Sequence, residues 1–226
     1  ANVENLTLTG TKEINGTGNA LANVLQGNAV ANSLSGAAGN DILQGGRGND
    51  CLNGGVGNDT YIFARGDQSD TITDTDSTVG NLDTLLFEPG VAAEQLWFRK
   101  TGSANLEVSI IGTQDKITIK NWSASGAGTK NQVELFKTSD GRTLSNTNVG
   151  KLVAAMAPLT PPAAGRTTLS AAYKKALLTT INANWTLAPR AAFCVAPELG
   201  GDRRVAGLVD AMASFGASPG GFDFAE

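Results

Sequence analysis

The sequence GAAGNDILQ (residues 36–44) continues without a gap into GGRGNDCLN (45–53) and GGVGNDTYI (54–62), so the chain repeats itself every nine residues. Two looser copies precede them, GNALANVLQ (18–26) and GNAVANSLS (27–35). Each block begins with glycine, carries Asn or Asp at its sixth position and has a large apolar residue at its eighth. Because three columns hold in register at once, the 28 glycines among 226 residues do not explain the pattern.

Each block divides into a six-residue turn and a three-residue strand. Side chains alternate in direction along a strand, so the eighth position points one way while the seventh and ninth point the other. One such unit cannot bury a core alone, so neighbouring units must stack, which predicts a solenoid. A flexible linker would give no reason for an apolar residue in every ninth place. The residues expected to face inward are Leu25, Leu34, Leu43, Leu52 and Tyr61.

The turns favour a ligand that seeks oxygen. Glycines at positions one, two and four permit positive φ and bring carbonyl oxygens toward one point. With the sixth-position aspartate they form a hard, anionic, flexible cage, which suits Ca²⁺ better than Mg²⁺ and suits zinc poorly. The sequence therefore predicts Ca²⁺ as the cofactor.

These blocks resemble the RTX family of secreted calcium-binding repeats, whose unit is written GGxGxDxUx. The resemblance implies a parallel β-roll in which turns 18 residues apart lie one above the other with calcium between them. Asp41 would then face Asp59, and Asp50 would face the irregular segment 66–70 on the opposite side. The candidate metal ligands are Gly36, Ala38, Asp41, Gly45, Arg47, Asp50, Gly54, Val56, Asp59, Asp67 and Asp70.

The two earliest blocks depart from this pattern. Leu21 and Val30 stand where the family has its third glycine, and a β-branched residue resists a left-handed backbone. Asn23 and Asn32 offer amide oxygens without charge, so their pairs with Asp41 and Asp50 are the weaker sites. We expect these turns to pack as plain solenoid, and the whole array to hold two or three ions rather than five.

Composition excludes several classes of function. A net charge of −4 and an isoelectric point near 4.9 argue against nucleic acid as a partner, because nucleic acid requires basic patches. No run of 18 apolar residues exists, so no membrane span is expected. Histidine is absent, which excludes Ser-His-Asp and Cys-His catalysis, and the chain is predicted not to be an enzyme. It opens on ANVENLTLTG without a signal peptide, as expected of a piece of a longer protein.

Residues 70–145 change to alternating strands separated by turn formers, which predicts antiparallel β structure that covers the open end of the roll. Their order resembles the haemolysin-type calcium-binding associated region that follows RTX repeats. Trp97 and Trp122 are either core residues, the interpretation we favour, or platforms for sugars. The cluster Asp70, Asp74, Asp76 and Asp83 is either a set of catalytic carboxylates or, as we expect, a mixture of calcium ligands and solvated strand ends. The expected ligands at the last turn are Asp67 and Asp70, with Asp74 as a further candidate.

Beyond Ser145 the pattern becomes helical. A helix capped by Asn146 or Asn148 is expected to bury Leu152 and Met156, a second is predicted over about 169–185 and a third over 202–215. The segment at Val149 recurs at Val205, and shared packing is the favoured explanation over docking on a neighbouring molecule. The tail 220–226 resembles the uncleaved signal of type I secretion substrates. Cys51 and Cys194 either form one bridge or remain free thiols.

Together these features predict a mainly β chain with a parallel β-roll (1–69), an antiparallel β cap (70–145) and a helical C-terminal region with a secretion-signal-like tail (146–226). The expected function is that of a calcium-binding, non-catalytic C-terminal region of a type I secreted adhesin or matrix protein. It would fold on calcium outside the cell, at the cell surface or in the extracellular medium. Expected partners are calcium ions, the type I secretion machinery, and either further copies of itself or a cell-surface or matrix partner.

Two other functions remain open from the sequence. One is the secretion and folding tail of an RTX extracellular enzyme, such as a protease, a lipase or a polysaccharide-modifying enzyme. The other is a sugar-binding module that uses Trp97 or Trp122.

Overall fold

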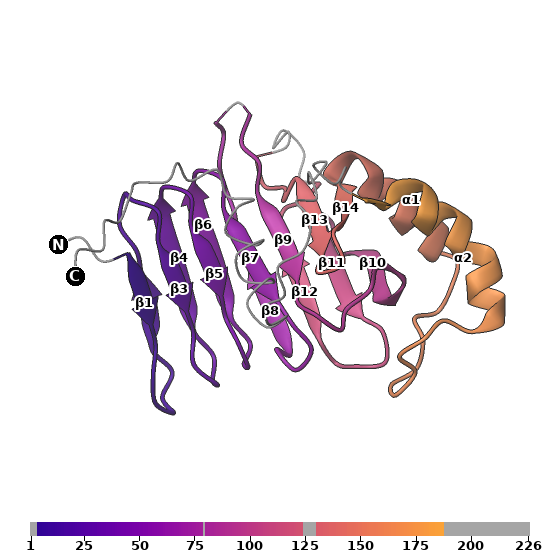
Figure 1. The fold of residues 1–226 in the computed structure, drawn as a ribbon, viewed down its shortest axis with the longest axis horizontal. Coiled ribbons are helices and arrows are strands. Elements are labelled where there is room, and N and C mark those ends of the chain that lie inside the picture. The colour runs from indigo at the N-terminus through magenta and orange to yellow at the C-terminus, as the bar shows by residue number, and fades with distance from the viewer. Residues whose placement is uncertain (1–3, 79, 124–129, 188–226) are drawn as a thin grey trace, which may run out of the picture. The chain divides into compact units, whose positions relative to one another are not determined.

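The computed structural model describes residues 4–78, 80–123 and 130–187, and all structural statements below concern these residues. They form two β-sheets of largely parallel strands, followed by two α-helices (Figure 1). The predicted fold class, a mainly β chain built on a parallel β-roll, is confirmed.

The two sheets take alternate strands of the chain, as a roll requires. Among the described residues the first sheet contains, in spatial order, β1 (Asn5–Thr7), β3 (Val24–Gln26), β5 (Ile42–Gln44), β7 (Thr60–Phe63), β9 (Thr84–Phe87), β13 (Leu135–Thr138), β14 (Arg142–Ser145) and β15 (Thr186–Leu187). The second contains β10 (Leu96–Thr101), β11 (Asn105–Ile110), β12 (Lys116–Ile119), β8 (Ser69–Ile72), β6 (Cys51–Val56), β4 (Ser33–Ala38) and β2 (Asn15–Thr17).

The strands stack with the predicted step of 18 residues. In the first sheet Leu25 pairs with Leu43 and Leu43 with Tyr61, while Leu34 pairs with Leu52 in the second. These eighth-position side chains are at most 1% exposed, so the inward column is confirmed. One apolar residue per nine is enough to form a core here, because each 18-residue step of the roll brings one apolar side chain from each of the two sheets.

Beyond residue 63 the same two sheets continue. β8 pairs in parallel with β6, and β9 with β7, so the roll gains one further strand on each side. The expected antiparallel pairs are present as β10–β11–β12 and β13–β14. They join the roll through parallel pairs, β12 on β8 and β13 on β9. The boundary predicted at residue 70 therefore separates two sequence patterns within continuous sheets, and as a domain boundary it remains a prediction.

Aromatic side chains and two helices close the far end of the roll. Phe136 packs its ring against those of Phe98 and Trp122, with centroids 5.7 and 5.9 Å apart. α1 (Asn146–Met156) contacts β10 and β14 through a buried face that includes Leu152 and Met156. α2 (Ala171–Asn184) contacts α1. Trp97 and Trp122 are 2% and 6% exposed, so both are core residues, as favoured from the sequence.

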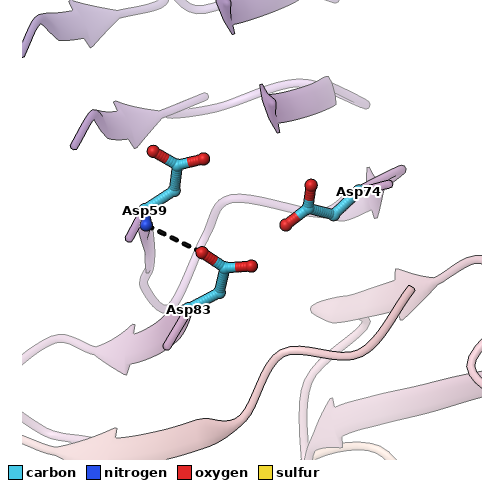
Figure 2. Close-up of side chains that lie close together, drawn as sticks. All are labelled: Asp59, Asp74 and Asp83. Atoms are coloured by element: carbon cyan, nitrogen blue, oxygen red, sulfur yellow. Dashed lines mark hydrogen bonds between the residues drawn. The ribbon is translucent and has the colours of Figure 1, made fainter. Parts of the chain in front are cut away.

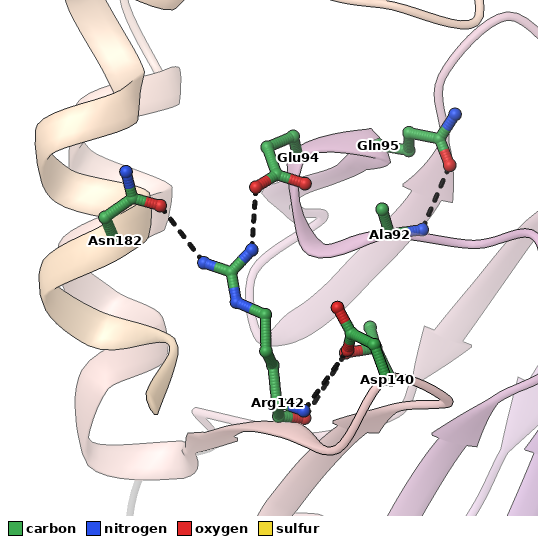
Figure 3. A network of polar contacts seen from close by, with 7 residues as sticks. Ala92, Glu94, Gln95, Asp140, Arg142 and Asn182 are labelled. Carbon is green, nitrogen blue, oxygen red and sulfur yellow. Dashed lines mark hydrogen bonds and ion pairs between the residues drawn. The ribbon is translucent and has the colours of Figure 1, made fainter. Parts of the chain in front are cut away.

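Arg142 ties α2 to the sheet. Its guanidinium lies 2.7 Å from Glu94 Oε1, in the short 3₁₀ helix η1 (Ala93–Gln95), and donates to Asn182 Oδ1 on α2 at 3.1 Å (Figure 3). The expected cap of α1 is corrected by one residue: Ser145 is the N-cap, because Asn146 already belongs to the helix. α2 begins as predicted, with Ser170 Oγ accepting from Tyr173 N–H.

Several sequence predictions fall outside the described residues: the helix over 202–215, the second copy of the helical segment at Val205, the tail 220–226 and Cys194. Cys51 is a free, exposed thiol. Within the part of the chain that the structure describes, no helix has the length and apolar character needed to cross a membrane.

Candidate metal centre

Along one edge of the roll, the residues immediately before β3, β5, β7 and β9 of the first sheet stack in a column. The backbone N–H of Asn23 donates to Asp41 Oδ1 at 2.7 Å, that of Asp41 to Asp59 Oδ1 at 2.8 Å, and that of Asp59 to Asp83 Oδ1 at 2.8 Å. We call Asn23, Asp41, Asp59 and Asp83 the first column. The predicted stacking of Asp41 with Asp59 is therefore present in the structure.

The opposite edge carries a second column formed by Asn32, Asp50 and Asp70. Asn32 N–H donates to Asp50 Oδ1 at 2.7 Å, and Asp50 N–H donates to Asp70 Oδ1 at 2.9 Å. Asp70 lies in β8, inside the segment that the sequence predicted to face Asp50. Each column is thus a ladder in which one carboxylate oxygen receives the backbone of the preceding turn.

In four of the stacked aspartates the second carboxylate oxygen has no hydrogen-bond donor. Oδ2 is buried and unpaired in Asp41, Asp50, Asp59 and Asp70, and these side chains are only 1–2% exposed. A buried carboxylate oxygen without a partner is costly, because it has lost its hydration and gained nothing in exchange. Four such oxygens in two columns are an arrangement that a bound cation would explain.

The first-position glycines make room for these oxygens. A Cβ atom on Gly36 would overlap both Asp41 Oδ2 and the carbonyl oxygen of Gly54, and one on Gly54 would overlap Asp59 Oδ2. A Cβ on Gly45 would likewise overlap Asp50 Oδ2. The absence of a side chain at the first position of each repeat thus lets carboxylate and carbonyl oxygens lie close together. Only oxygen ligands are present in this cradle, which matches the preference of calcium.

The third-position residues contribute differently from the aspartates. Arg47 and Val56 are exposed and Ala38 is half-buried. None of the three has a side-chain oxygen, so each is predicted to bind calcium through its backbone carbonyl oxygen. The Val56 carbonyl oxygen accepts a hydrogen bond from Gly39 N–H at 2.8 Å. It is therefore already engaged by one donor in the stacked turn.

The early turns close without an unpaired carboxylate. Asn23 Oδ1 accepts from Asn19 N–H at 2.7 Å, and Asn32 Oδ1 accepts from Asn28 N–H at 2.8 Å. Leu21 and Val30 stay out of the positive-φ region that Gly39 and other fourth-position glycines adopt. The amide oxygens of these turns are thus already hydrogen-bonded, and that the turns hold no ion remains a prediction.

Asp67 lies beside the second column and is supported by a residue that the sequence analysis did not single out. Asp67 Oδ2 accepts from Ala64 N–H at 2.7 Å. Asp115 receives the backbone N–H groups of Gly66 and Gln68 at 3.0 and 3.1 Å, so it fixes the loop on which Asp67 sits. Its position just before β12 was the signal available in the sequence, since the aspartates of both columns also lie at or next to the start of a strand.

The expectation that Asp76 and Asp83 are solvated strand ends is wrong, and Asp74, a further candidate for a calcium ligand of the last turn, is buried with them. All three are at most 4% exposed. The cause is that the segment between β8 and β9 folds back on the last repeat: Asp76 Oδ2 accepts from Gly57 N–H and Asp83 Oδ1 from Asp59 N–H. Asp83 thereby extends the first column beyond the repeats.

Burial raises the pKa of these acids, because the charged form loses its hydration. The pKa rises to about 6 for Asp50 and Asp67, to about 7 for Asp59 and to about 8 for Asp70. Neighbouring carboxylates add to the desolvation: the charges of Asp83 and Asp41 raise the pKa of Asp59 further. Near neutral pH the columns therefore favour a proton or a cation over free negative charge.

Comparison with known families identifies the array. Residues 17–50 and 26–61 match the model of the RTX calcium-binding nonapeptide repeat, four copies. This chain contains RTX calcium-binding repeats. Residues 105–148 match the haemolysin-type calcium-binding protein related domain, which agrees with the resemblance seen in the cap. Calcium is therefore the cofactor of the RTX array, and the predicted RTX repeats and their cofactor are confirmed.

Other comparisons add less. No curated protein matches the RTX chain. Among solved structures, a subunit of the mannuronan C5-epimerase from Azotobacter vinelandii is similar, with 21% identity and a TM-score of 0.37. The match covers 74% of this chain and 92% of the epimerase subunit. At that level of similarity it supports no argument about the site or the function.

Proposed function

We propose that this chain is the calcium-dependent, non-catalytic C-terminal region of a protein exported by type I secretion, and that it folds on calcium outside the cell. The observation that carries the proposal is the set of buried, unpaired Oδ2 atoms of Asp41, Asp50, Asp59 and Asp70. In the first column Asp41 would hold an ion together with the Gly54 carbonyl, which lies beside it. In the second, Asp50 and Asp70 would do so with Asp67 nearby.

Calcium would act on the folding equilibrium through charge. Without a cation, stacking the columns forces carboxylates with raised pKa values close together, while the glycine-rich turns keep their entropy by staying unfolded. In a calcium-poor cytosol the segment would therefore remain unfolded and fit for export. Each bound Ca²⁺ supplies two positive charges and gives the unpaired oxygens a partner.

The free energy of calcium binding is large enough to decide whether a marginally stable domain folds. Extracellular sites with dissociation constants of about 10⁻⁴ to 10⁻³ M gain roughly 0.4 to 1.4 kcal/mol each at millimolar calcium. Two or three coupled sites then contribute a few kcal/mol, against total domain stabilities of about 5 to 15 kcal/mol. Calcium would thus decide whether this segment is folded.

An adhesin or matrix protein is the parent we favour, with self-association as part of its role. β1 and β2 end their sheets among the described residues, so their outer edges present backbone groups that another turn or another copy would pair. Static light scattering with calcium and with EGTA tests this part. Calcium-dependent growth beyond the monomer mass supports assembly, whereas a monomer under both conditions contradicts it and leaves the folding proposal intact.

A further inference from the structure

Three carboxylates meet where the repeat array passes into the cap. Asp59 belongs to the last repeat, Asp83 precedes β9 and Asp74 lies in the segment between β8 and β9 (Figure 2). One oxygen from each lies within 4.8 Å of the other two, and all three side chains are 1% exposed. No ion pair described in the structure reaches any of them.

The register of the roll explains how Asp74 comes to this place. Leu34 pairs with Leu52, and Leu52 pairs with Ile72. Two residues beyond each of them stand Gly36, Gly54 and Asp74. Asp74 therefore occupies the position of a first-position glycine in a turn that is no longer a repeat.

The presence of aspartate instead of glycine at this position changes the ligands that the turn provides. In the repeat below, the Gly54 carbonyl oxygen lies beside Asp41 Oδ2. At the next step the chain supplies a carboxylate, Asp74, beside Asp59. A neutral ligand is thus exchanged for a charged one, and Asp83 brings a third carboxylate to the same point.

The hydrogen bonds of the cluster leave two oxygens without donors. Asp83 uses Oδ1 for Asp59 N–H and Oδ2 for the Asn81 amide, while Asp74 Oδ1 accepts from Thr75 N–H. Asp74 Oδ2 and Asp59 Oδ2 are buried and unpaired. Asp76, two residues from Asp74, is the contrast, because both of its oxygens accept backbone N–H groups, from Thr78 and Gly57.

We propose that Asp59, Asp74 and Asp83 form a calcium site of their own at this seam, in addition to the sites of the repeats. Three negative carboxylates and no basic side chain suit a hard divalent cation. Oxygens up to 4.8 Å apart fit around one Ca²⁺, whose bonds of about 2.3–2.6 Å place opposite ligands about 5 Å apart. Mg²⁺, with bonds of about 2.1 Å, would require the cluster to contract.

The site shares Asp59 with the array but does not depend on occupation of the repeats. Its role would follow from its place, because it joins the last repeat to β9 and to the segment that crosses from β8. A calcium ion there would fix the cap on the roll. The competing explanation is a proton: a neutral Asp74 that donates to Asp83 would also relieve the repulsion.

Ion counting separates the two explanations. The protein is titrated with calcium chloride by isothermal calorimetry, and bound calcium is counted after equilibrium dialysis, for the wild type and for Asp74→Asn. Asparagine keeps the shape of Asp74 and a hydrogen-bond donor but loses the charge. We expect Asp74→Asn to bind one calcium ion fewer than the wild type. An unchanged count and affinity would overturn the site and favour the proton.

Two variants serve as controls. Asp76→Asn removes a buried charge from the same segment and should leave the ion count unchanged. Asp41→Asn removes a repeat ligand and should leave the seam ion in place. If Asp41→Asn loses an ion and Asp74→Asn does not, the seam proposal fails while the repeat sites stand. If only Asp74→Asn loses one, the seam stands and the assignment of the repeat sites fails.

A second measurement covers the case in which Asp74→Asn does not fold, as judged by circular dichroism in saturating calcium. Crystals of the wild-type protein grown with calcium should show an anomalous difference peak between Asp59, Asp74 and Asp83. A map without a peak at that point rejects the proposal.

Discussion

The turns that carry Asn23 and Asn32 stack on the turns above them with the same backbone hydrogen bond as the turns that carry Asp41, Asp50 and Asp59. Their side chains differ in one respect. Each asparagine oxygen accepts a backbone N–H within its own turn, whereas each aspartate leaves Oδ2 buried and unpaired. The same turn is thus hydrogen-bonded through an amide at one end of the roll, whereas in the middle of the roll it has a carboxylate oxygen that a cation would bind. We therefore expect calcium dependence from particular turns rather than from the roll as a whole.

The largest effect should come from removing a carboxylate of the middle turns. Asp59→Ala deletes a charged side chain with an unpaired Oδ2 and the acceptor of Asp41 N–H, while Asn23→Ala deletes a neutral amide whose Oδ1 accepts from Asn19 N–H. We expect Asp59→Ala to raise the calcium midpoint of β-sheet formation more than about tenfold, equivalent to about 1.4 kcal/mol, and Asn23→Ala to raise it far less. Circular dichroism during a calcium titration measures both. Equal shifts would contradict the distinction between the turns.

The pH dependence of the metal-free protein is the second test. Folded pKa values of about 6 for Asp50, about 7 for Asp59 and about 8 for Asp70 lie above the unfolded value of about 4. At these three positions the fold holds protons that the unfolded chain releases, so their contribution to stability is greatest below about pH 4 and falls as the pH rises toward 8. In EGTA, we expect more β structure at pH 4.5 than at pH 8.

Calcium should reverse this trend, since the ion and the protons compete for the same oxygens. Its affinity should rise between pH 5 and pH 8. A calcium affinity that does not change over this range would show that the aspartates with raised pKa values are not the ligands.

Replacing Asn32 by aspartate would give an early turn the carboxylate that the middle turns carry. Asn32 Nδ2 donates to the Ile14 carbonyl oxygen at 2.8 Å, so Asn32→Asp would place a carboxylate oxygen against a carbonyl oxygen. We expect Asn32→Asp to raise the calcium concentration at which the protein folds but to regain wild-type stability in saturating calcium. Asn32→Ala is the control and should remain destabilised in saturating calcium, as measured by a calcium titration followed by circular dichroism and by urea unfolding in saturating calcium.

The smallest effect concerns backbone strain in the first aspartate turn. Ala37 has a φ of 88°, while the corresponding Gly46 and Gly55 have φ values of 81° and 103°. A residue with a Cβ pays roughly 1 kcal/mol in this region, so Ala37→Gly should stabilise the calcium-bound protein by about 1 kcal/mol. Urea unfolding in saturating calcium measures the gain, and a loss of stability would show that the Ala37 methyl group contributes packing.

The sequence predicted the part of the site that follows the nine-residue period. Eighteen-residue stacking placed Asp41 on Asp59 correctly, because both lie within uninterrupted repeats. Past Ile62 the step changes to 20 residues between Asp50 and Asp70 and to 24 between Asp59 and Asp83, since longer connections separate the strands. A local signal for Asp83 existed: the run from Asp83 to Phe87 repeats the pattern from Asp59 to Phe63, Asp-Thr followed by apolar residues.

Asp74 had no such signal. Its position depends on the register between β6 and β8, which is set by the fold of an irregular connection rather than by a repeat. The burial of Asp76 likewise follows from a bond to Gly57 N–H in another turn. Sequence patterns identify residues that share a periodic environment, whereas the seam is formed by segments that meet once only.

The central claim is that the middle turns require calcium to fold. The most direct measurement is far-ultraviolet circular dichroism at pH 8 in EGTA and then in millimolar calcium, with the bound ions counted on the same samples. We predict little β-sheet signal in EGTA and its cooperative appearance with at least two bound calcium ions. A full β-sheet spectrum in EGTA at pH 8, unchanged when calcium is added, would contradict this account.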